Sequence, residues 1–494
     1  MHDDFERCYR AVQSKDARFD GWFVTAVLTT KIYCRPSCPV RPPHARNMRF
    51  YPTAAAAHSA GFRACKRCRP DASPGSPEWN VRGDVVARAM RLIADGTVDR
   101  EGVTGLADRL GYTTRQLERL LRAEVGANPL ALARAQRSQT ARVLIETTEL
   151  PFSDVAFASG FSSIRQFNDT VRAVCGLTPT ALRQRARNRF GRSDGGAGTL
   201  SLRLPVRTPF AYEGVFGHLA ASAVPGVEEV RGGAYRRTLR LPNGNGIVSL
   251  TPQPDHVQCL VVLDDFRDLT TAIARCRRLL DLDADPEAVV DALGADPDLS
   301  ALVAKGPGQR IPRTVDEQEL AVRVVLGQQV SVKAARTHAG RIASAYGQPV
   351  ADPNGGLTHV FPAVEHLVEL DPVHLAFPKS RQRSLTALIN ALSGGDVVLD
   401  AGCDWDRARE QIRALPGIGP WTAEVIAMRG LGDPDAFPAT DLGVRLAAEQ
   451  LGLPTDPHPL TEYSSRWRPW RSYVTQHLWS ALDHAVNDWP PKEK

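Results

Sequence analysis

The spacing of hydrophobic positions divides this chain into regions of different structure. Two related blocks, one from Leu106 and one from Val155, have apolar residues at helical spacing, which predicts paired amphipathic helices. From roughly Leu200 to Asp283, apolar and polar residues alternate in segments such as YRRTLRLPNGNGIVSLTPQ, where an Asn-Gly turn joins two predicted strands. From Pro286 onward the pattern is helical again. The chain therefore combines all-α and α+β regions.

Two stretches rich in Pro, Gly or Ser, Arg69–Asp84 and Ser193–Thr199, are typical of linkers. With 494 residues the chain exceeds what one hydrophobic core usually serves, so a multidomain fold is expected. We predict four domains: a small α/β domain at 1–75, an all-α domain at 82–190, an α+β domain at 199–285 and a second all-α domain at 286–494.

Composition and charge narrow the function classes. The chain is 43% apolar and 23% charged, no apolar run approaches the ~18 residues of a membrane span, and its first residues lack the apolar core of a signal peptide. We therefore expect a cytoplasmic protein without a membrane segment. Through Arg192 there are 31 Lys and Arg against 18 Asp and Glu, whereas the remainder has 30 against 37. The basic first part is typical of a nucleic-acid binder.

Four of the nine cysteines form a C-x3-C and C-x2-C pattern: Cys34, Cys38, Cys65 and Cys68. Two short-spaced pairs can converge on one tetrahedral ion, and a thiolate quartet selects Zn²⁺. A site that only staples a small domain is the alternative to a reactive one. The other five cysteines are expected to be buried thiols.

The sequence around the quartet, including YCRPSC and FRACKRCRPD, closely resembles the methyl-acceptor domain of the Ada family. The resemblance implies that Cys34 takes a methyl group from a DNA methylphosphotriester. Zinc would keep its thiol deprotonated, and methylation would reduce the site's net charge from −2 to −1 and strengthen DNA binding. Expected phosphate contacts are Arg63, Lys66 and Arg67, with Arg35, Arg41, Arg46 and Arg69 as further basic neighbours.

The two helical blocks align with each other, Gly111-Tyr112 matching Gly160-Phe161. A generic helical bundle would explain the periodicity but not the duplicated turn, so a tandem helix-turn-helix is predicted. The second copy resembles the AraC family of transcription regulators, which implies promoter DNA and RNA polymerase as partners. Candidate base-reading residues are Arg115, Gln116, Arg119, Ser163, Arg165 and Gln166.

A Gly-Pro-rich turn at 416–420, PGIGP, lies between two apolar helical runs, and Asp441 follows Trp421 by twenty residues. Glycines and exposed N–H groups before a helix suit a phosphate, so Gly417 and Gly419 are candidate DNA contacts, together with Arg466 and Arg471. An ordinary helical hairpin with a capping Asp is the alternative. The whole segment resembles the helix-hairpin-helix DNA glycosylases.

Further segments, such as VRVVLGQQVSVKAA and RWRPWRSYVTQHLW, resemble the AlkA family of alkylation-repair glycosylases. This resemblance implies a TBP-like α+β domain before the helices. It implies hydrolytic release of bases such as 3-methyladenine without a cofactor, with Asp441 supporting the sugar cation and Trp421 and Trp479 stacking on the base. Helix-hairpin-helix glycosylases that also cleave the DNA strand carry a lysine nucleophile at the position of Trp421. Strand cleavage is therefore not expected.

The chain departs from the family at three places. Gln329 replaces the apolar wedge that the family inserts into the gap left by the flipped base, and Val425, Leu442 and Ser480 replace pocket aromatics. Thr440 is the residue before the catalytic Asp. A bifunctional, monomeric alkylation-damage protein acting on duplex DNA in the nucleoid is the leading hypothesis. The alternative is a transcription regulator whose glycosylase half binds DNA without efficient catalysis.

Overall fold

The computed structural model describes residues 2–68, 70, 83–190, 199–353, 355–371 and 378–491. It separates into two compact units, one of residues 1–205 with 241–244 and 259–274, and one of the remaining residues. Most of both predicted linkers lies outside the described residues. No helix in the described ranges is long and apolar enough to cross a membrane.

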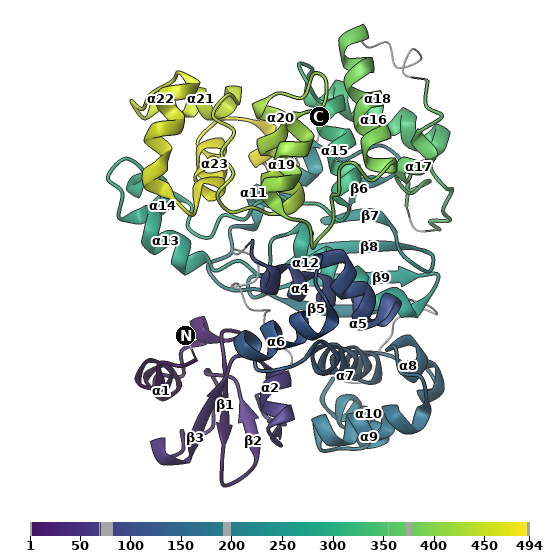
Figure 1. Ribbon diagram of the computed structural model, residues 1–494, viewed down its shortest axis with the longest axis vertical. Coiled ribbons are helices and arrows are strands. Elements are labelled where there is room, and N and C mark those ends of the chain that lie inside the picture. Colours follow the sequence, from purple (N-terminus) through teal and green to yellow (C-terminus); the bar gives the residue numbers. More distant parts are fainter. Residues whose placement is uncertain are drawn as a thin grey trace. The chain divides into compact units, whose positions relative to one another are not determined.

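The first part of the chain forms a four-stranded sheet of order β3-β1-β2-β4, flanked by short helices (Figure 1). Strand β1 pairs antiparallel with β2 and β3, whereas β2 and β4 run parallel, with Tyr33 opposite Ala64. Because Cys34 ends β2 and Cys65 follows β4, this parallel pairing brings the two cysteines together. The elements are α1 (Phe5–Gln13), η1 (Ala17–Phe19), β1 (Val24–Val27), β2 (Ile32–Cys34), η2 (Ala45–Asn47), β3 (Met48–Tyr51), α2 (Ala54–Ser59) and β4 (Arg63–Ala64).

Within residues 83–190 the structure has seven helices, and they include the paired helices that the spacing predicts. Gly111 and Gly126 adopt left-handed φ values of +75° and +69° and end the two helices of the first block. In the second block, Gly160 and Gly176 also have positive φ values and follow the ends of the two helices. The apolar face of the first block, including Leu106, Leu117 and Leu121, is fully buried. The helices are α4 (Val85–Ala94), α5 (Thr97–Leu110), α6 (Thr114–Val125), α7 (Pro129–Thr147), α8 (Phe152–Ala158), α9 (Ile164–Cys175) and α10 (Pro179–Phe190).

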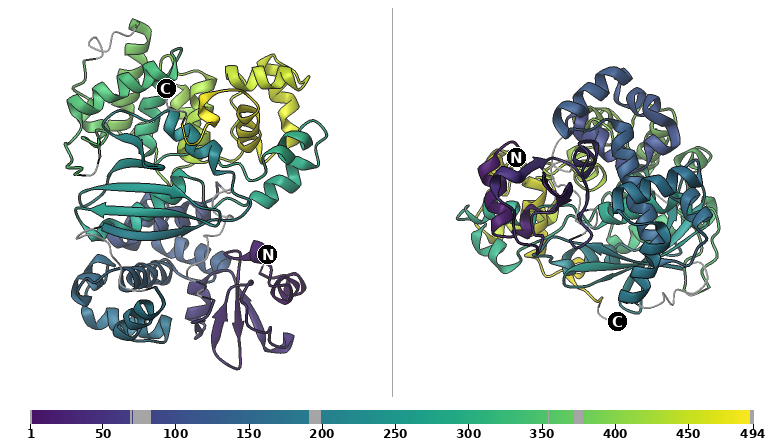
Figure 2. Two further views of the ribbon diagram at one scale, coloured as in Figure 1. Left: turned by 180° about the vertical axis from the view of Figure 1, so that it is seen from behind. Right: turned by 90° about the horizontal axis from the view of Figure 1, so that it is seen from below.

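The predicted α+β region forms a five-stranded sheet of order β5-β9-β8-β7-β6. Strands β6, β7 and β8 pair as an antiparallel meander, which the left view of Figure 2 shows from behind. The elements are β5 (Thr199–Pro205), α11 (Tyr212–Ala221), β6 (Glu228–Arg231), β7 (Ala234–Arg240), β8 (Asn245–Pro252), β9 (His256–Leu263), η4 (Phe266–Asp268) and α12 (Leu269–Leu279).

The remaining helices bury two separate apolar clusters. One gathers residues of α15, α16, α18, α19 and α20, and the other gathers residues of α13, α14, α21 and α23. The helices are α13 (Pro286–Gly294), α14 (Ser300–Lys305), α15 (Glu317–Leu326), α16 (Val332–Tyr346), α17 (Val364–Leu367), α18 (Lys379–Ser393), α19 (Trp405–Arg413), α20 (Pro420–Val425), the π-helical η6 (Ile426–Leu431), α21 (Leu442–Gln450), α22 (Pro457–Tyr463), η7 (Ser464–Trp467), α23 (Arg471–Ser480) and η8 (Ala485–Asn487). This multidomain architecture confirms the predicted fold class.

Candidate functional sites

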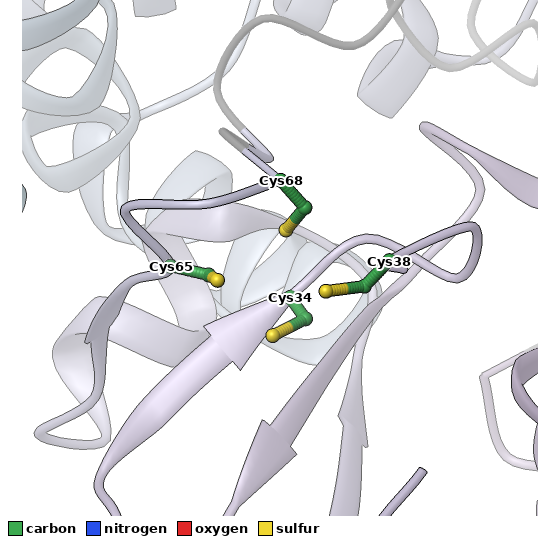
Figure 3. Close-up of side chains that lie close together, drawn as sticks. All are labelled: Cys34, Cys38, Cys65 and Cys68. Carbon is green, nitrogen blue, oxygen red and sulfur yellow. The ribbon is translucent and has the colours of Figure 1, made fainter. Parts of the chain in front are cut away.

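The four clustered cysteines converge, as Figure 3 shows, with their sulfur atoms within 4.8 Å of one another. Tetrahedral Zn–S bonds of about 2.3 Å place sulfurs about 3.8 Å apart, so the quartet fits one zinc ion. Cys38, Cys65 and Cys68 are buried, whereas Cys34 is partly exposed.

A buried carboxylate holds the turn between Cys34 and Cys38. Asp20 is 5% exposed and accepts hydrogen bonds from the backbone N–H of Ser37 at 3.0 Å and from its hydroxyl at 2.6 Å. The guanidinium of Arg35 lies 3.4 Å from the same carboxylate. Asp20 therefore orients Arg35, which follows Cys34, and Ser37, which precedes Cys38. The sequence analysis did not identify this role.

Three predicted phosphate contacts lie around the second cysteine pair. Arg67 is exposed, whereas Arg63 and Lys66 are partly exposed. A Cβ at Gly176, just after α9, would come within 3.1 Å of Lys66 Cε and 3.4 Å of Arg63 Cδ. The side-chain stems of these two residues therefore pack on the second helix-turn-helix.

The six candidate base-reading residues divide into two groups. Arg115, Arg119 and Arg165 are exposed on α6 and α9. Gln116 completes a capping box with Thr113 at the start of α6, and Ser163 caps α9 by accepting the backbone N–H of Gln166. The side chain of Gln166 in turn accepts a hydrogen bond from Ser162. The second group, Gln116, Ser163 and Gln166, thus stabilises the starts of α6 and α9.

The carboxylate of Asp441 is held from three sides. Trp421 Nε1 donates to Oδ2 at 2.8 Å, Trp479 Nε1 donates to Oδ1 at 2.9 Å, and the backbone N–H of Val444 donates to Oδ1 at 3.0 Å. Asp441 is thereby also the N-cap of α21. Trp421 packs against the cluster around α15 and Trp479 against the cluster around α21, so the carboxylate lies where the two clusters meet.

The PGIGP turn presents its glycines to solvent and anchors itself through Ile418, which is 7% exposed. Gly417 has a φ of +71°, and a Cβ there would lie 2.0 Å from the hydroxyl oxygen of Ser384 on α18. Gly419 begins α20 with a φ of −90° and nothing within 4 Å of a Cβ. Gly417 is therefore required by backbone conformation and space, whereas Gly419 is open to a ligand.

The predicted wedge residue lies at the tip of the turn between α15 and α16. Gln329 is exposed and has a left-handed φ of +53°. The amide of Gln328, beside it, donates to Gly417 O and to Thr422 Oγ1. The structure thus joins the wedge turn to the hairpin, a link that the sequence analysis did not identify.

Other predicted residues have mixed surroundings. Arg466 is 48% exposed and stacks on Tyr463, with its guanidinium carbon 4.0 Å from the ring centroid. Arg471 forms a two-bond ion pair with Asp435, at 2.7 and 2.9 Å, and is only 12% exposed. Because the donors of Arg471 bind Asp435, the side chain is not available to a DNA phosphate, contrary to the prediction. Of the replaced aromatics, Val425 is buried and Leu442 is 68% exposed.

His218 of α11 is a second residue that the sequence analysis missed. Its ring is nearly parallel to Trp479, with centroids 6.1 Å apart and an interplanar angle of 23°. Burial lowers the pKa of His218 well below 6.5, and the nearby Arg429 and Arg323 lower it further. A neutral imidazole therefore lies beside the aromatic ring that orients Asp441.

Comparison with known proteins decides the family. Residues 7–71 match the metal binding domain of Ada, residues 106–185 a helix-turn-helix domain, and residues 201–316 the AlkA N-terminal domain. The chain is 77% identical over all 494 residues, and over the full length of the relative, to the probable bifunctional transcriptional activator/DNA repair enzyme AlkA from two strains of Mycobacterium tuberculosis. The chain belongs to this family. Its cysteine quartet is accordingly a zinc site.

The second half has relatives of its own. DNA-3-methyladenine glycosylase 2 of Escherichia coli is 32% identical over 292 residues, which cover 58% of this chain and 97% of that protein. The solved 3-methyladenine DNA glycosylase from Archaeoglobus fulgidus superposes with a TM-score of 0.50 at 20% identity, covering 56% of this chain and 97% of that one. The latter likeness shows a shared fold.

Proposed function

We propose that this protein repairs and reports alkylation damage in DNA, by hydrolysing the glycosidic bond of alkylated purines at Asp441 and by accepting methyl groups on Cys34. The observation that carries the first activity is the carboxylate of Asp441, oriented by two indole N–H groups beside a turn suited to a phosphate. The names of its relatives, a bifunctional activator and repair enzyme and a 3-methyladenine glycosylase, support both activities.

In the glycosylase reaction, an alkylated purine carries positive charge and leaves with the electrons of its bond to the sugar. Positive charge then develops on the sugar ring, and the Asp441 carboxylate stabilises it electrostatically. Water adds to the sugar carbon and gives its proton to the same carboxylate or to solvent. Trp421 and Trp479 fix the carboxylate through their N–H groups and offer ring faces to the cationic base, at roughly 0.5–2 kcal/mol for each such contact.

In the methyl transfer, the sulfur of Cys34 attacks the methyl carbon of a phosphotriester. The C–O bond breaks, its electron pair stays on the phosphate oxygen, and the products are a thioether and a phosphodiester. Cys34, Cys38, Cys65 and Cys68 would hold the zinc ion, which would keep the Cys34 thiol deprotonated near neutral pH. Cys34 is suited to this role because it is the one partly exposed member of the quartet. Exposed Arg67 and the partly exposed Arg63 and Lys66 would hold the flanking phosphates.

The tandem helix-turn-helix supplies the regulatory activity. We assign promoter reading to Arg115, Arg119 and Arg165, which are exposed on the second helix of each motif. Gln116, Ser163 and Gln166 contribute by fixing where those helices begin. RNA polymerase is the expected partner of the DNA-bound form. We propose that the protein acts as a monomer in the nucleoid.

One experiment tests both activities. The protein is incubated with methylated duplex DNA while free bases are followed by chromatography and the protein by intact mass and peptide mapping. We expect release of 3-methyladenine and one added methyl on Cys34. Asp441→Asn should abolish base release and leave the methyl transfer unchanged. Equal base release by Asp441→Asn would reduce the second half to DNA binding, and an unmodified Cys34 would reduce the zinc site to a structural one.

A further inference from the structure

One side chain links the turn that carries the proposed wedge with the turn that is proposed to hold a phosphate. The side-chain amide of Gln328 donates to the backbone oxygen of Gly417 at 3.2 Å and to the hydroxyl of Thr422 at 2.9 Å. Gln329 is the next residue and is exposed. The proposed wedge therefore begins one peptide bond away from two contacts with the hairpin.

Both acceptors belong to well-fixed positions. Thr422 is 2% exposed and lies in the first turn of α20. Ser384 packs against Gly417 so closely that the Cα of Gly417 has no room for a methyl group. On the other side, α15 ends in Val325 and Leu326, both fully buried. The amide thus bridges two rigid elements.

The amide is not needed to end α15. The last carbonyl groups of that helix already accept the backbone N–H groups of Gly327 and Gln328, at 3.0 to 3.2 Å. Its two bonds serve the contact with the hairpin instead. From Thr422 the chain of contacts continues through the adjacent Trp421 to Asp441, since the indole of Trp421 donates to that carboxylate.

We propose that Gln328 is a positioning residue of the glycosylase, which holds the wedge at a fixed distance from the phosphate-binding turn and from Asp441. This inference rests on the proposed glycosylase function. Extruding a base from a paired duplex requires energy, and a wedge helps only if it enters the stack while the backbone is gripped at the correct spacing. An unpaired base needs little such help. Gln328 should therefore matter for paired lesions and not for unpaired ones.

Two variants isolate this role. Gln328→Leu replaces the amide with an apolar side chain of similar volume and removes both donors. Gln328→Glu keeps the shape but loses the donor to the backbone oxygen of Gly417, whereas the Thr422 hydroxyl can still donate to the carboxylate, so this variant separates the two contacts. Gln450→Leu is the matched control, because Gln450 is exposed at the end of α21. Thermal melting of all three variants measures any loss of stability.

The test compares single-turnover release of 7-methylguanine from a fully paired duplex and from the same strand with the lesion in a one-nucleotide bulge. We expect Gln328→Leu to slow release from the paired duplex about tenfold, the scale of two lost hydrogen bonds, and to change release from the bulge less than about twofold. A 2-aminopurine beside the lesion should report slower base extrusion in the duplex. Gln450→Leu should match the wild type on both substrates.

Equal slowing on both substrates, or no slowing on either, would overturn the role of Gln328 while leaving the glycosylase intact. Should Gln328→Leu melt markedly lower, the ratio of the two rates at a temperature where it is folded still decides, because a merely structural loss lowers both alike. A wild-type protein that releases no base from either substrate would refute the proposed glycosylase function, and this inference with it.

Discussion

Trp479 and Asp441, 38 residues apart in the chain, are joined by an indole N–H···O hydrogen bond of 2.9 Å. Trp421 makes the equivalent bond to the other carboxylate oxygen at 2.8 Å. Both oxygens of the proposed catalytic carboxylate are therefore bound by aromatic side chains from different apolar clusters. The two tryptophans should contribute to the reaction through orientation as well as through stacking.

Removing one indole N–H while keeping an aromatic ring should slow base release. Hydrogen bonds to charged groups are worth about 1.5–3 kcal/mol, so Trp479→Phe and Trp421→Phe should each reduce the single-turnover rate about 10- to 100-fold. Trp470→Phe is the matched control, since Trp470 packs on Tyr473 with ring centroids 5.7 Å apart. Rates that are unchanged in both active-site variants would show that stacking alone explains the two tryptophans.

The two glycines of the hairpin should differ in their response to alanine. At Gly417 an alanine must adopt a φ of +71° and crowd the Ser384 hydroxyl, so Gly417→Ala should lose at least about 1–2 kcal/mol of stability and weaken DNA binding. Gly419→Ala meets no described atom within 4 Å and has an ordinary φ of −90°, so it should fold normally. Thermal melting and binding to an abasic-site duplex measure both effects. A Gly417→Ala protein as stable as Gly419→Ala would contradict this account.

These contacts show which parts of the site can be predicted from sequence. The quartet of Cys34, Cys38, Cys65 and Cys68 is predictable because the two ligands of each pair, three or four positions apart, must lie close together. The capping role of Gln116 is also accessible, since Thr113 and Gln116 have the spacing of a capping box. The sequence analysis predicts Gln116 only as a base reader, although this local signal also gives it a capping role.

Other contacts depend on packing between distant segments. The amide of Gln328 reaches Gly417, 89 residues later, only because α15 and α20 share one apolar cluster. His218 comes from the α+β region and reaches Trp479 of α23 across even more of the sequence. A single sequence has no local pattern for such pairs. The ion pair that occupies Arg471 was missed for the same reason, because Asp435 precedes it by 36 residues.

Zinc removal should separate the two activities. Structural zinc sites contribute apparent free energies of about 10–16 kcal/mol to folding, and the sheet around the quartet otherwise rests on two small apolar clusters. Chelation or Cys68→Ser should therefore release one zinc, expose residues 1–68 to limited proteolysis and abolish methyl acceptance. Base release should persist, because within the described part of the chain the quartet is the one group found that could hold a metal. Loss of base release together with zinc would show that the two halves depend on each other.

Acid should destabilise the glycosylase helices through His477. Its side chain is 1% exposed, and neither ring nitrogen has a hydrogen-bond partner among the described residues. Burial lowers the pKa of His477 from 6.5 to about 4. Below pH 6.5 the unfolded state therefore binds a proton that the folded state does not, and stability should fall as the pH drops from 6.5 toward 4. The share of His477 in this loss is about 3 kcal/mol.

Urea unfolding at pH 7 and pH 5 measures the effect, and tryptophan fluorescence reports it because six of the eight tryptophans follow residue 400. His477→Leu should be at least as stable as the wild type at pH 7 and should lose less stability at pH 5, since the buried polar ring is gone. A residual loss is expected from His218, whose pKa is also lowered. His458→Leu is the control, because the side chain of His458 is 85% exposed and its replacement removes no buried imidazole. If His477→Leu keeps the wild-type dependence on pH, His477 is not the group that makes these helices sensitive to acid.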